Sequence, residues 1–114
     1  MDRLLLQRHA ELCQTLASPV RLEILNLLRG DEQRVSELAQ ATGLNQANVS
    51  QHLAVLRNKR IVSTRREGTN VYYRVANPKM IRACDLIREV LAEQADEHLE
   101  IARAARSTTR RQTT

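Results

Sequence analysis

The sequence predicts a mainly α-helical fold with one small β-hairpin, and three observations indicate it. Apolar residues recur at helical spacing over most of the 114 residues. Two short runs rich in β-branched and aromatic residues, 61–66 and 71–75, flank a Glu-Gly-Thr-Asn turn. Between 36 and 59, a glycine separates a short helical segment from a second one with a polar face. These patterns favour a single domain over residues 1–106.

The first part of the chain predicts two helices. Residues 2–16 place leucines at helical spacing. Ser18-Pro19 then signals the start of a helix, because serine can cap free amide groups and proline in the first turn loses no hydrogen bond. We expect this second helix over 21–29. Gly30 ends it, because glycine adopts the left-handed cap conformation easily.

A helix-turn-helix pattern follows. A third helix is expected to begin near Ser36 and to stop at Gly43. Asn45 can cap a fourth helix that runs to about Lys59. The expected buried stripe of the fourth helix consists of Val49, Leu53 and Leu56.

The hairpin and a long helix complete the predicted domain. The runs 61–66 and 71–75 are expected to be the two strands, and Asn77-Pro78 ends the second. A helix is then expected over 79–106. Residues 107–114 have nothing to bury, so they are expected to form a disordered basic tail.

The net charge of +5 is concentrated beside the helix-turn-helix. Between 57 and 74, six basic residues stand against the single acid Glu67, which favours contact with a phosphate backbone. No signal peptide is evident, and no apolar run is long enough to span a membrane. Two widely separated cysteines make no disulfide framework, so a reducing cytoplasm is expected.

The helix-turn-helix and the charged hairpin together predict a winged helix-turn-helix that binds double-stranded DNA. The short polar side chains on the fourth helix suit base edges in the major groove, and arginines near the hairpin suit the backbone or the minor groove. Because neighbouring strand residues face opposite ways, only one of Arg65 and Arg66 is expected to contact DNA well. His52 is either a phosphate contact or a structural histidine. The predicted DNA-binding residues are Gln46, Ala47, Asn48, Ser50, Gln51, His52, Arg57, Arg65 and Arg66.

Three segments resemble the ArsR/SmtB family of small bacterial repressors. They are Leu-Ala-Ser-Pro-Val-Arg-Leu-Glu-Ile-Leu, Asn-Val-Ser-Gln-His-Leu-Ala-Val-Leu and Arg-Glu-Gly-Thr-Asn-Val-Tyr-Tyr-Arg-Val. The resemblance spans about residues 11–87. It implies five helices with a hairpin between the fourth and fifth, and a homodimer formed through the first and last helices. It also implies repression at an imperfect palindrome until an inducer weakens DNA binding.

The sequence departs from the metal sensors of that family. Arg34 and Ser36 stand where arsenic and cadmium sensors carry thiolates. The residues aligned with the zinc ligands are Asn77, Lys79, Val90 and Glu93, of which only the last is a carboxylate. A lone carboxylate does not hold zinc, so neither of these two family metal sites is expected, and no cofactor is expected. Lys59-Arg60 also replaces the Ala-Gly that is usual before the wing.

The two cysteines leave the inducer open. Cys13 and Cys84 lie on the helices expected at the dimer interface. Each is either a small buried hydrophobe or part of a thiol switch, or the pair joins His9 in a metal or metalloid site. No nucleophile–base pair or phosphate loop is evident, so an enzyme is not expected. Two alternatives to a switched repressor remain, a winged helix that binds only protein and a DNA-binding regulator without an inducer.

Overall fold

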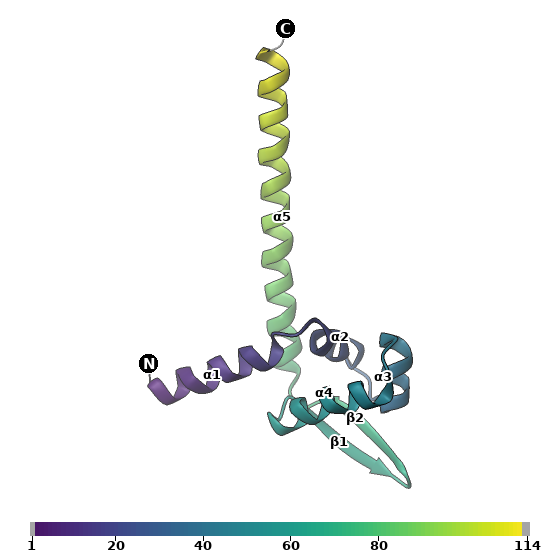
Figure 1. Ribbon diagram of the computed structural model, residues 1–114. Helices are drawn as coiled ribbons and strands as arrows, with labels where there is room; N and C mark the ends of the chain where they lie inside the picture. Colours follow the sequence, from purple (N-terminus) through teal and green to yellow (C-terminus); the bar gives the residue numbers. More distant parts are fainter. Residues whose placement is uncertain (1, 113–114) are drawn as a thin grey trace. The chain divides into compact units, whose positions relative to one another are not determined.

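The computed structural model describes residues 2–112, and within them five helices and two strands follow one another (Figure 1). Their bounds are α1 Arg3–Leu16, α2 Pro19–Leu27, α3 Val35–Thr42, α4 Gln46–Asn58, β1 Val62–Glu67, β2 Asn70–Val75 and α5 Pro78–Gln112. The predicted fold class, mainly α-helical with one β-hairpin, is confirmed. By internal contacts the chain divides into two compact units, residues 1–81 and residues 82–114.

Local capping residues set the start of α2 and the turn between α3 and α4. The Ser18 hydroxyl accepts a hydrogen bond from the Arg21 amide at 3.3 Å, and α2 begins at once with Pro19, two residues earlier than predicted. Gly43 ends α3 in the left-handed conformation, with φ of 75°. Asn45 then caps α4, because its side-chain oxygen accepts the Asn48 amide at 2.8 Å.

The core of residues 1–81 is aliphatic. The predicted stripe of α4 is fully buried, and it packs against side chains from α2, α3 and the start of β1. The members of this core are Ile24, Leu25, Leu28, Leu38, Ala39, Val49, Leu53, Leu56, Ile61 and Val62. Because α4 buries only this stripe, the opposite face of the helix remains exposed.

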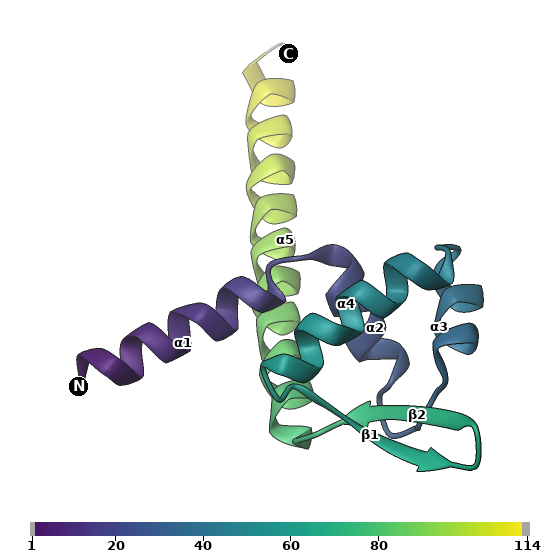
Figure 2. The ribbon, with the colours of Figure 1, turned by 60° about the horizontal axis from the view of Figure 1, so that its bottom comes forward.

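The hairpin is a regular antiparallel pair. Its register runs from Val62 opposite Val75 to Glu67 opposite Asn70. Gly68, with φ of 62°, takes the first central position of the two-residue turn, where a side chain would be strained. Figure 2 shows the two strands lying side by side and joined at this turn. We call β1, β2 and the turn between them the wing.

The last helix is longer than predicted. The Asn77 side chain accepts the Lys79 amide at 3.0 Å, and α5 begins at Pro78. The helix continues to Gln112, so residues 107–112 of the tail predicted to be disordered are helical. Extending an existing helix by a few residues requires no new nucleation, which allows polar residues to prolong it. Residues 113 and 114 of that tail lie outside the described residues.

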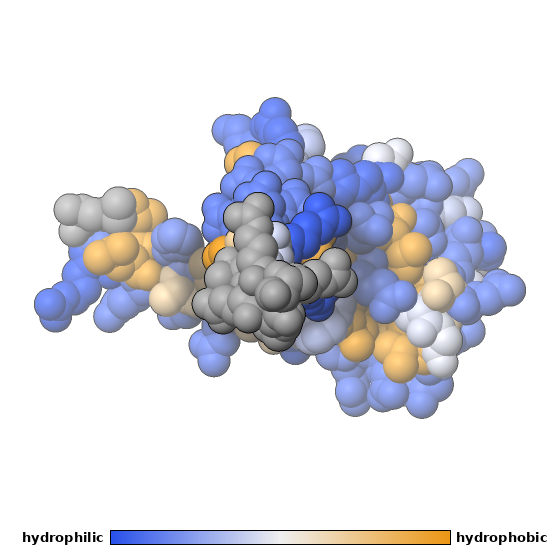
Figure 3. Space-filling view, turned by 90° about the horizontal axis from the view of Figure 1, so that it is seen from above, coloured by the Kyte–Doolittle hydropathy of each residue, from blue (hydrophilic) through white to orange (hydrophobic). Residues whose placement is uncertain are grey.

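Large apolar side chains are exposed on α1 and α5. Leu4, Leu5 and Leu6 are about half exposed, and Figure 3 shows apolar side chains at the surface of α1, on the left of the view. In residues 82–112 the exposed set is Leu86, Ile87, Val90, Leu91, Leu99 and Ile101. Despite this apolar surface, none of the helices in residues 2–112 is both long and apolar enough to cross a membrane.

Candidate nucleic-acid interface

The exposed face of α4 carries most of the predicted base-reading residues. Asn45 caps the helix, and the side chains of its first two turns that point away from the core are short and polar or small. Val49, in the same turns, is fully buried and fixes which way the helix faces. The exposed residues of this surface are Gln46, Ala47, Asn48, Ser50 and Gln51. Short side chains of this kind let a helix enter the major groove and reach base edges.

His52 lies beside that surface and is engaged within the protein. The Arg21 Nε donates a hydrogen bond to His52 Nδ1 at 3.2 Å, and Arg21 Nη1 donates to the Thr15 carbonyl at 3.1 Å. Because Nδ1 accepts, this contact assigns the proton of the neutral imidazole to Nε2. Of the two alternatives for His52, this contact favours the structural histidine, and Arg21 is the residue that also bonds to the end of α1.

Arg65 is also engaged within the protein. It donates to the Glu32 carboxylate from Nε at 3.0 Å and from Nη2 at 2.8 Å, and from Nη1 to Glu67 at 3.0 Å. Its guanidinium lies over the Tyr72 ring, 4.7 Å from the centroid. The hydrogen bond from Arg65 lowers the pKa of the Glu32 carboxyl, and the charges of Arg65 and Arg74 lower it further.

Backbone pairing also joins the wing to the loop between α2 and α3. Gln33 and Tyr73 form a β-bridge in which Gln33 N donates to Tyr73 O at 3.0 Å and Tyr73 N to Gln33 O at 2.8 Å. The Gln33 side chain donates to the Leu27 carbonyl at 2.6 Å, so this loop is also tied to α2. Glu32 and Gln33 are not among the residues predicted from the sequence. Only the acidic pair Asp31-Glu32, in a chain whose wing is rich in arginine, hinted at such a role.

Arg66 and Arg57 remain available to a ligand. Arg66 follows Arg65 in β1 and is exposed, and it has no ion pair within residues 2–112. Because side chains alternate along a strand, the contact of Arg65 with Glu32 places Arg66 on the other face of the wing. Arg57 is exposed in the last turn of α4. Of the two adjacent wing arginines, Arg66 has the geometry suited to a phosphate contact.

The two cysteines differ in accessibility. Cys84 is only 8% exposed, as expected of a small buried hydrophobe, whereas Cys13 is exposed. Position 13 faces outward on α1, while Leu12 and Leu16 are packed against the core. Among the described residues, no three His, Cys, Asp or Glu side chains gather closely enough to hold a metal ion.

The α2–α3–α4 arrangement, the wing and the exposed polar face of α4 define a winged helix-turn-helix transcriptional regulator. Residues 18–64 match the family of bacterial regulatory proteins of the arsR type. The protein Rv0081 of Mycobacterium tuberculosis is 38% identical over 93 residues, which cover 81% of this chain and 82% of that protein. This chain therefore belongs to the ArsR family, which is a family of regulators and not of enzymes.

Solved structures and a longer relative agree with this membership. The crystal structure of Rv0081 superimposes with a TM-score of 0.78 at 35% identity, covering 87% of this chain and 99% of that one. The homodimeric winged helix-turn-helix DNA-binding domain of Mb0332 from Mycobacterium bovis gives 0.73 at 39% identity, covering 82% and 88%. The regulator Rv0324 of M. tuberculosis is 41% identical over 102 residues, 89% of this chain, but the match spans only 43% of its length.

Proposed function

We propose that the chain is a homodimeric, cytoplasmic repressor that binds a palindromic operator, with residues 1–106 acting as one DNA-binding and dimerisation domain. The observation that carries this proposal is the juxtaposition of the exposed polar face of α4 with a wing that presents Arg66. A protein-interaction module would not need bidentate amide side chains on the second helix of a helix-turn-helix together with an unpaired cation on the wing.

In this proposal α4 enters the major groove. Gln51 and Asn48 pair with adenine edges, since an amide can donate to N7 and accept from N6 at once. Gln46 and Ser50 donate to or accept from neighbouring bases, and Ala47 contacts a thymine methyl. Arg66 and Arg57 contact phosphates, which fixes the register of the helix without adding sequence preference. Arg65 and His52 hold the wing and α4 in place instead of contacting DNA strongly.

Dimerisation would bring two such helices to one operator. Burial of the apolar side chains that are exposed on α1 and α5 would be favourable, and the Ile87 side chain alone is 61% exposed. A second copy supplies matching surfaces by symmetry, and the related domain of Mb0332 is homodimeric. A two-fold dimer presents its recognition helices to half-sites about 34 Å apart, one turn of DNA. The two-fold symmetry of such a dimer explains why the proposed operator is palindromic.

A thiol response remains a hypothesis for the signal. Cys13 is the accessible thiol, and it lies on a helix of the proposed interface. Oxidation of an exposed cysteine side chain adds polar atoms, which would oppose packing of α1 against a second copy. Cys84 is buried and is not readily reached by an oxidant.

Fluorescence anisotropy of the DNA upstream of its own gene, titrated with the protein against random competitor, tests the repressor proposal. Preference for the upstream DNA is expected, with a stoichiometry of one dimer per operator. An absence of preference for any segment of the neighbouring DNA would contradict it and leave the protein-interaction alternative. Repeating the titration with oxidant, for the wild type and for Cys13→Ser, tests the thiol response. Equal sensitivity of both proteins would exclude a role for Cys13.

A further inference from the structure

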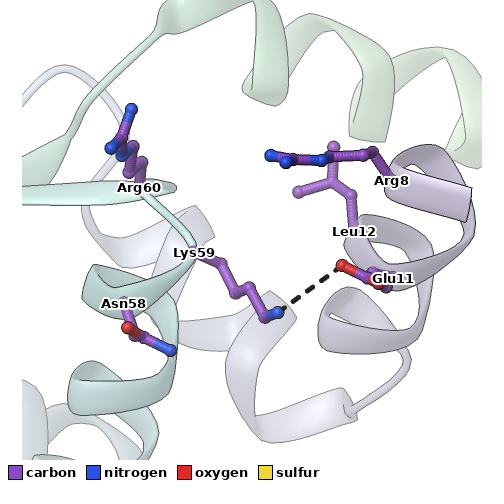
Figure 4. A pocket seen from close by; sticks show the side chains of 6 residues that line it. All are labelled: Arg8, Glu11, Leu12, Asn58, Lys59 and Arg60. Carbon is purple, nitrogen blue, oxygen red and sulfur yellow. Dashed lines mark ion pairs between the residues drawn. The ribbon is translucent and has the colours of Figure 1, made fainter. Parts of the chain in front are cut away.

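A basic cavity of about 410 Å³ lies between α1 and the end of α4 (Figure 4). We propose that it binds a small organic oxyanion, a carboxylate or a phosphate ester, and that this ligand modulates operator binding. The inference rests on the proposed function for its regulatory part only. The residues that line the cavity are Arg8, Glu11, Leu12, Asn58, Lys59 and Arg60.

The charges around the cavity are unbalanced. Lys59 Nζ lies 3.8 Å from Glu11 Oε2, so the one carboxylate of the lining is matched by the one amine. The guanidinium groups of Arg8 and Arg60 have no ion pair within residues 2–112. Figure 4 shows Arg8 extending from α1 toward the junction of α4 and β1, where Arg60 stands. Two unpaired guanidinium groups at one cavity suit an oxyanion, because each offers a planar fork of donors that matches carboxylate or phosphate oxygens.

The backbone at Arg60 is a second, independent observation. With φ of 61°, Arg60 is the one residue other than glycine that has positive φ in the described chain. Its amide donates to the Arg57 carbonyl at 3.0 Å, which closes the end of α4 in the conformation that normally favours glycine. Strained non-glycine residues cluster at active sites, ligand clamps and switch regions. Here the strained residue supplies one of the two unpaired cations of the cavity.

The rest of the lining indicates the size and nature of the ligand. Leu12 gives the cavity an apolar portion, and the Asn58 amide can donate or accept a further hydrogen bond. A short carbon skeleton that carries one or two acidic groups fits this set. Asn58 follows Gln51, the last of the base-reading residues, by seven residues, or about 10 Å of helix. The proposed occupant is a free small molecule, and contact of these cations with DNA phosphates is an outcome that the experiment separates.

An occupant of this cavity would couple two functions. It would contact α1, which belongs to the proposed dimer interface. It would also contact the end of α4, the helix that is proposed to read DNA. A ligand shifts an equilibrium only by its differential affinity for the two states. An anion that pairs with Arg8 and Arg60 together favours the arrangement in which α1 and the α4–β1 junction lie close. Operator affinity then depends on whether the DNA-bound dimer has that arrangement.

Nuclear magnetic resonance of the whole chain tests the site without DNA. Inorganic phosphate and citrate are added separately at constant ionic strength, and the Nε–H signals of Arg8 and Arg60 are followed. We expect saturable shifts for at least one anion at millimolar concentration, abolished in Arg8→Gln and Arg60→Gly but retained in Arg3→Gln, an exposed control on α1. Arg60→Gly keeps the left-handed backbone accessible, so its loss of binding cannot be attributed to misfolding.

Operator anisotropy with and without the binding anion supplies the second readout. A change in operator affinity in the wild type that is absent in Arg60→Gly supports the regulatory role. Linear, unsaturated shifts with both anions would overturn the proposal. A second result would also overturn it: no free anion binds, and Arg8→Gln and Arg60→Gly flatten the salt dependence of DNA binding. The two arginines would then contact DNA phosphates. Saturable anion binding by a protein that recognises no operator would refute the proposed function and leave the anion site standing.

Discussion

Arg65 donates to Glu32 across 33 positions of the sequence, with Arg65 Nη2 2.8 Å from Glu32 Oε2. This pair attaches the wing to the loop between α2 and α3, next to the β-bridge between Gln33 and Tyr73. A free hairpin of two strands is only marginally stable in water. The wing therefore depends on this attachment for a fixed orientation. The position of the Arg66 side chain depends in turn on the orientation of the wing.

The attachment is expected to weaken in acid. Arg65 lowers the pKa of Glu32 below its ordinary value of 4.5 in the folded protein. A carboxyl with a depressed folded-state pKa stabilises the fold above its unfolded-state pKa, and this stabilisation is lost as the pH falls through the folded-state pKa. The protection of the Tyr73 amide against hydrogen exchange should therefore fall below about pH 4.5, relative to the protection of buried core amides.

Glu32→Gln is the matched variant for this prediction. It keeps the shape of the side chain but removes its charge, so fast exchange of the Tyr73 amide should already be present at neutral pH, with little further acid dependence. Glu23→Gln, which changes an exposed carboxylate of α2, is the control. Identical exchange profiles for Glu32→Gln and the wild type would show that the ion pair does not hold the wing.

The contact between Arg21 and His52 should contribute to the stability of the fold. Replacing either residue with alanine removes a hydrogen bond between α2 and α4. A double-mutant cycle measured by urea denaturation should give a coupling free energy of about 0.5–1.5 kcal/mol. Additive effects of the two substitutions would indicate that the contact contributes nothing in solution, and would reopen the assignment of His52 to a phosphate contact.

Leu53 should be among the positions most sensitive to truncation. It is fully buried in the aliphatic core, and the chain has no Phe or Trp that could fill a void. Leu53→Ala should lower the free energy of unfolding by about 2–5 kcal/mol, a large part of the stability of a small domain. Urea denaturation measures this, with Gln51→Ala as a control on the exposed face of the same helix. Equal losses for the two variants would contradict the observed packing of α4.

The parts of the fold that depend on residues close together in the sequence could be predicted. Ser18, Gly43 and Asn45 each act on amides or dihedral angles within a few positions of themselves, so their roles follow from local chemistry. The spacing of Val49 and Leu53 likewise fixed the buried side of α4 and therefore its exposed side.

The contacts that position the site could not be predicted in the same way. Glu32 with Arg65 and Arg21 with His52 join residues more than 30 positions apart, and no local pattern pairs them. Arginine itself does not signal the left-handed conformation of Arg60, and only the glycine that is usual at this position in the family hinted at it. The sequence thus predicted which residues are polar and lie outside the core. The structure separated the side chains that face solvent from those that make contacts within the protein.

Dimerisation should depend on the apolar face of α5. Ile87 is largely exposed, and a charge buried against a second copy would be unpaired. Ile87→Glu should therefore shift the protein from dimer to monomer in sedimentation velocity and weaken operator binding, while the circular dichroism spectrum of the fold is kept. Glu89→Gln, two residues further along α5, is the control. A monomeric wild type, or a dimer unaffected by Ile87→Glu, would place the interface elsewhere.

Gln51 and Arg66 should fail in different ways when each is replaced by alanine. Loss of Gln51 removes a base contact worth about 1–3 kcal/mol of discrimination, so affinity should fall for the operator but little for random DNA. Loss of Arg66 removes a phosphate contact, so affinity should fall on all sequences and the slope of log K against log salt should decrease by about 1. Competition anisotropy at several salt concentrations separates the two patterns.

The same measurement on Arg65→Ala provides a demanding comparison for the wing. Arg65 makes its hydrogen bonds within the protein, so its loss should act by freeing the wing and should resemble Glu32→Gln. Both variants should weaken DNA binding. Neither should lower the slope of log K against log salt, because Arg66 still contacts a phosphate. If Arg65→Ala instead reduced the salt slope as much as Arg66→Ala, both arginines would contact the backbone, and the contact with Glu32 would have to open when DNA binds.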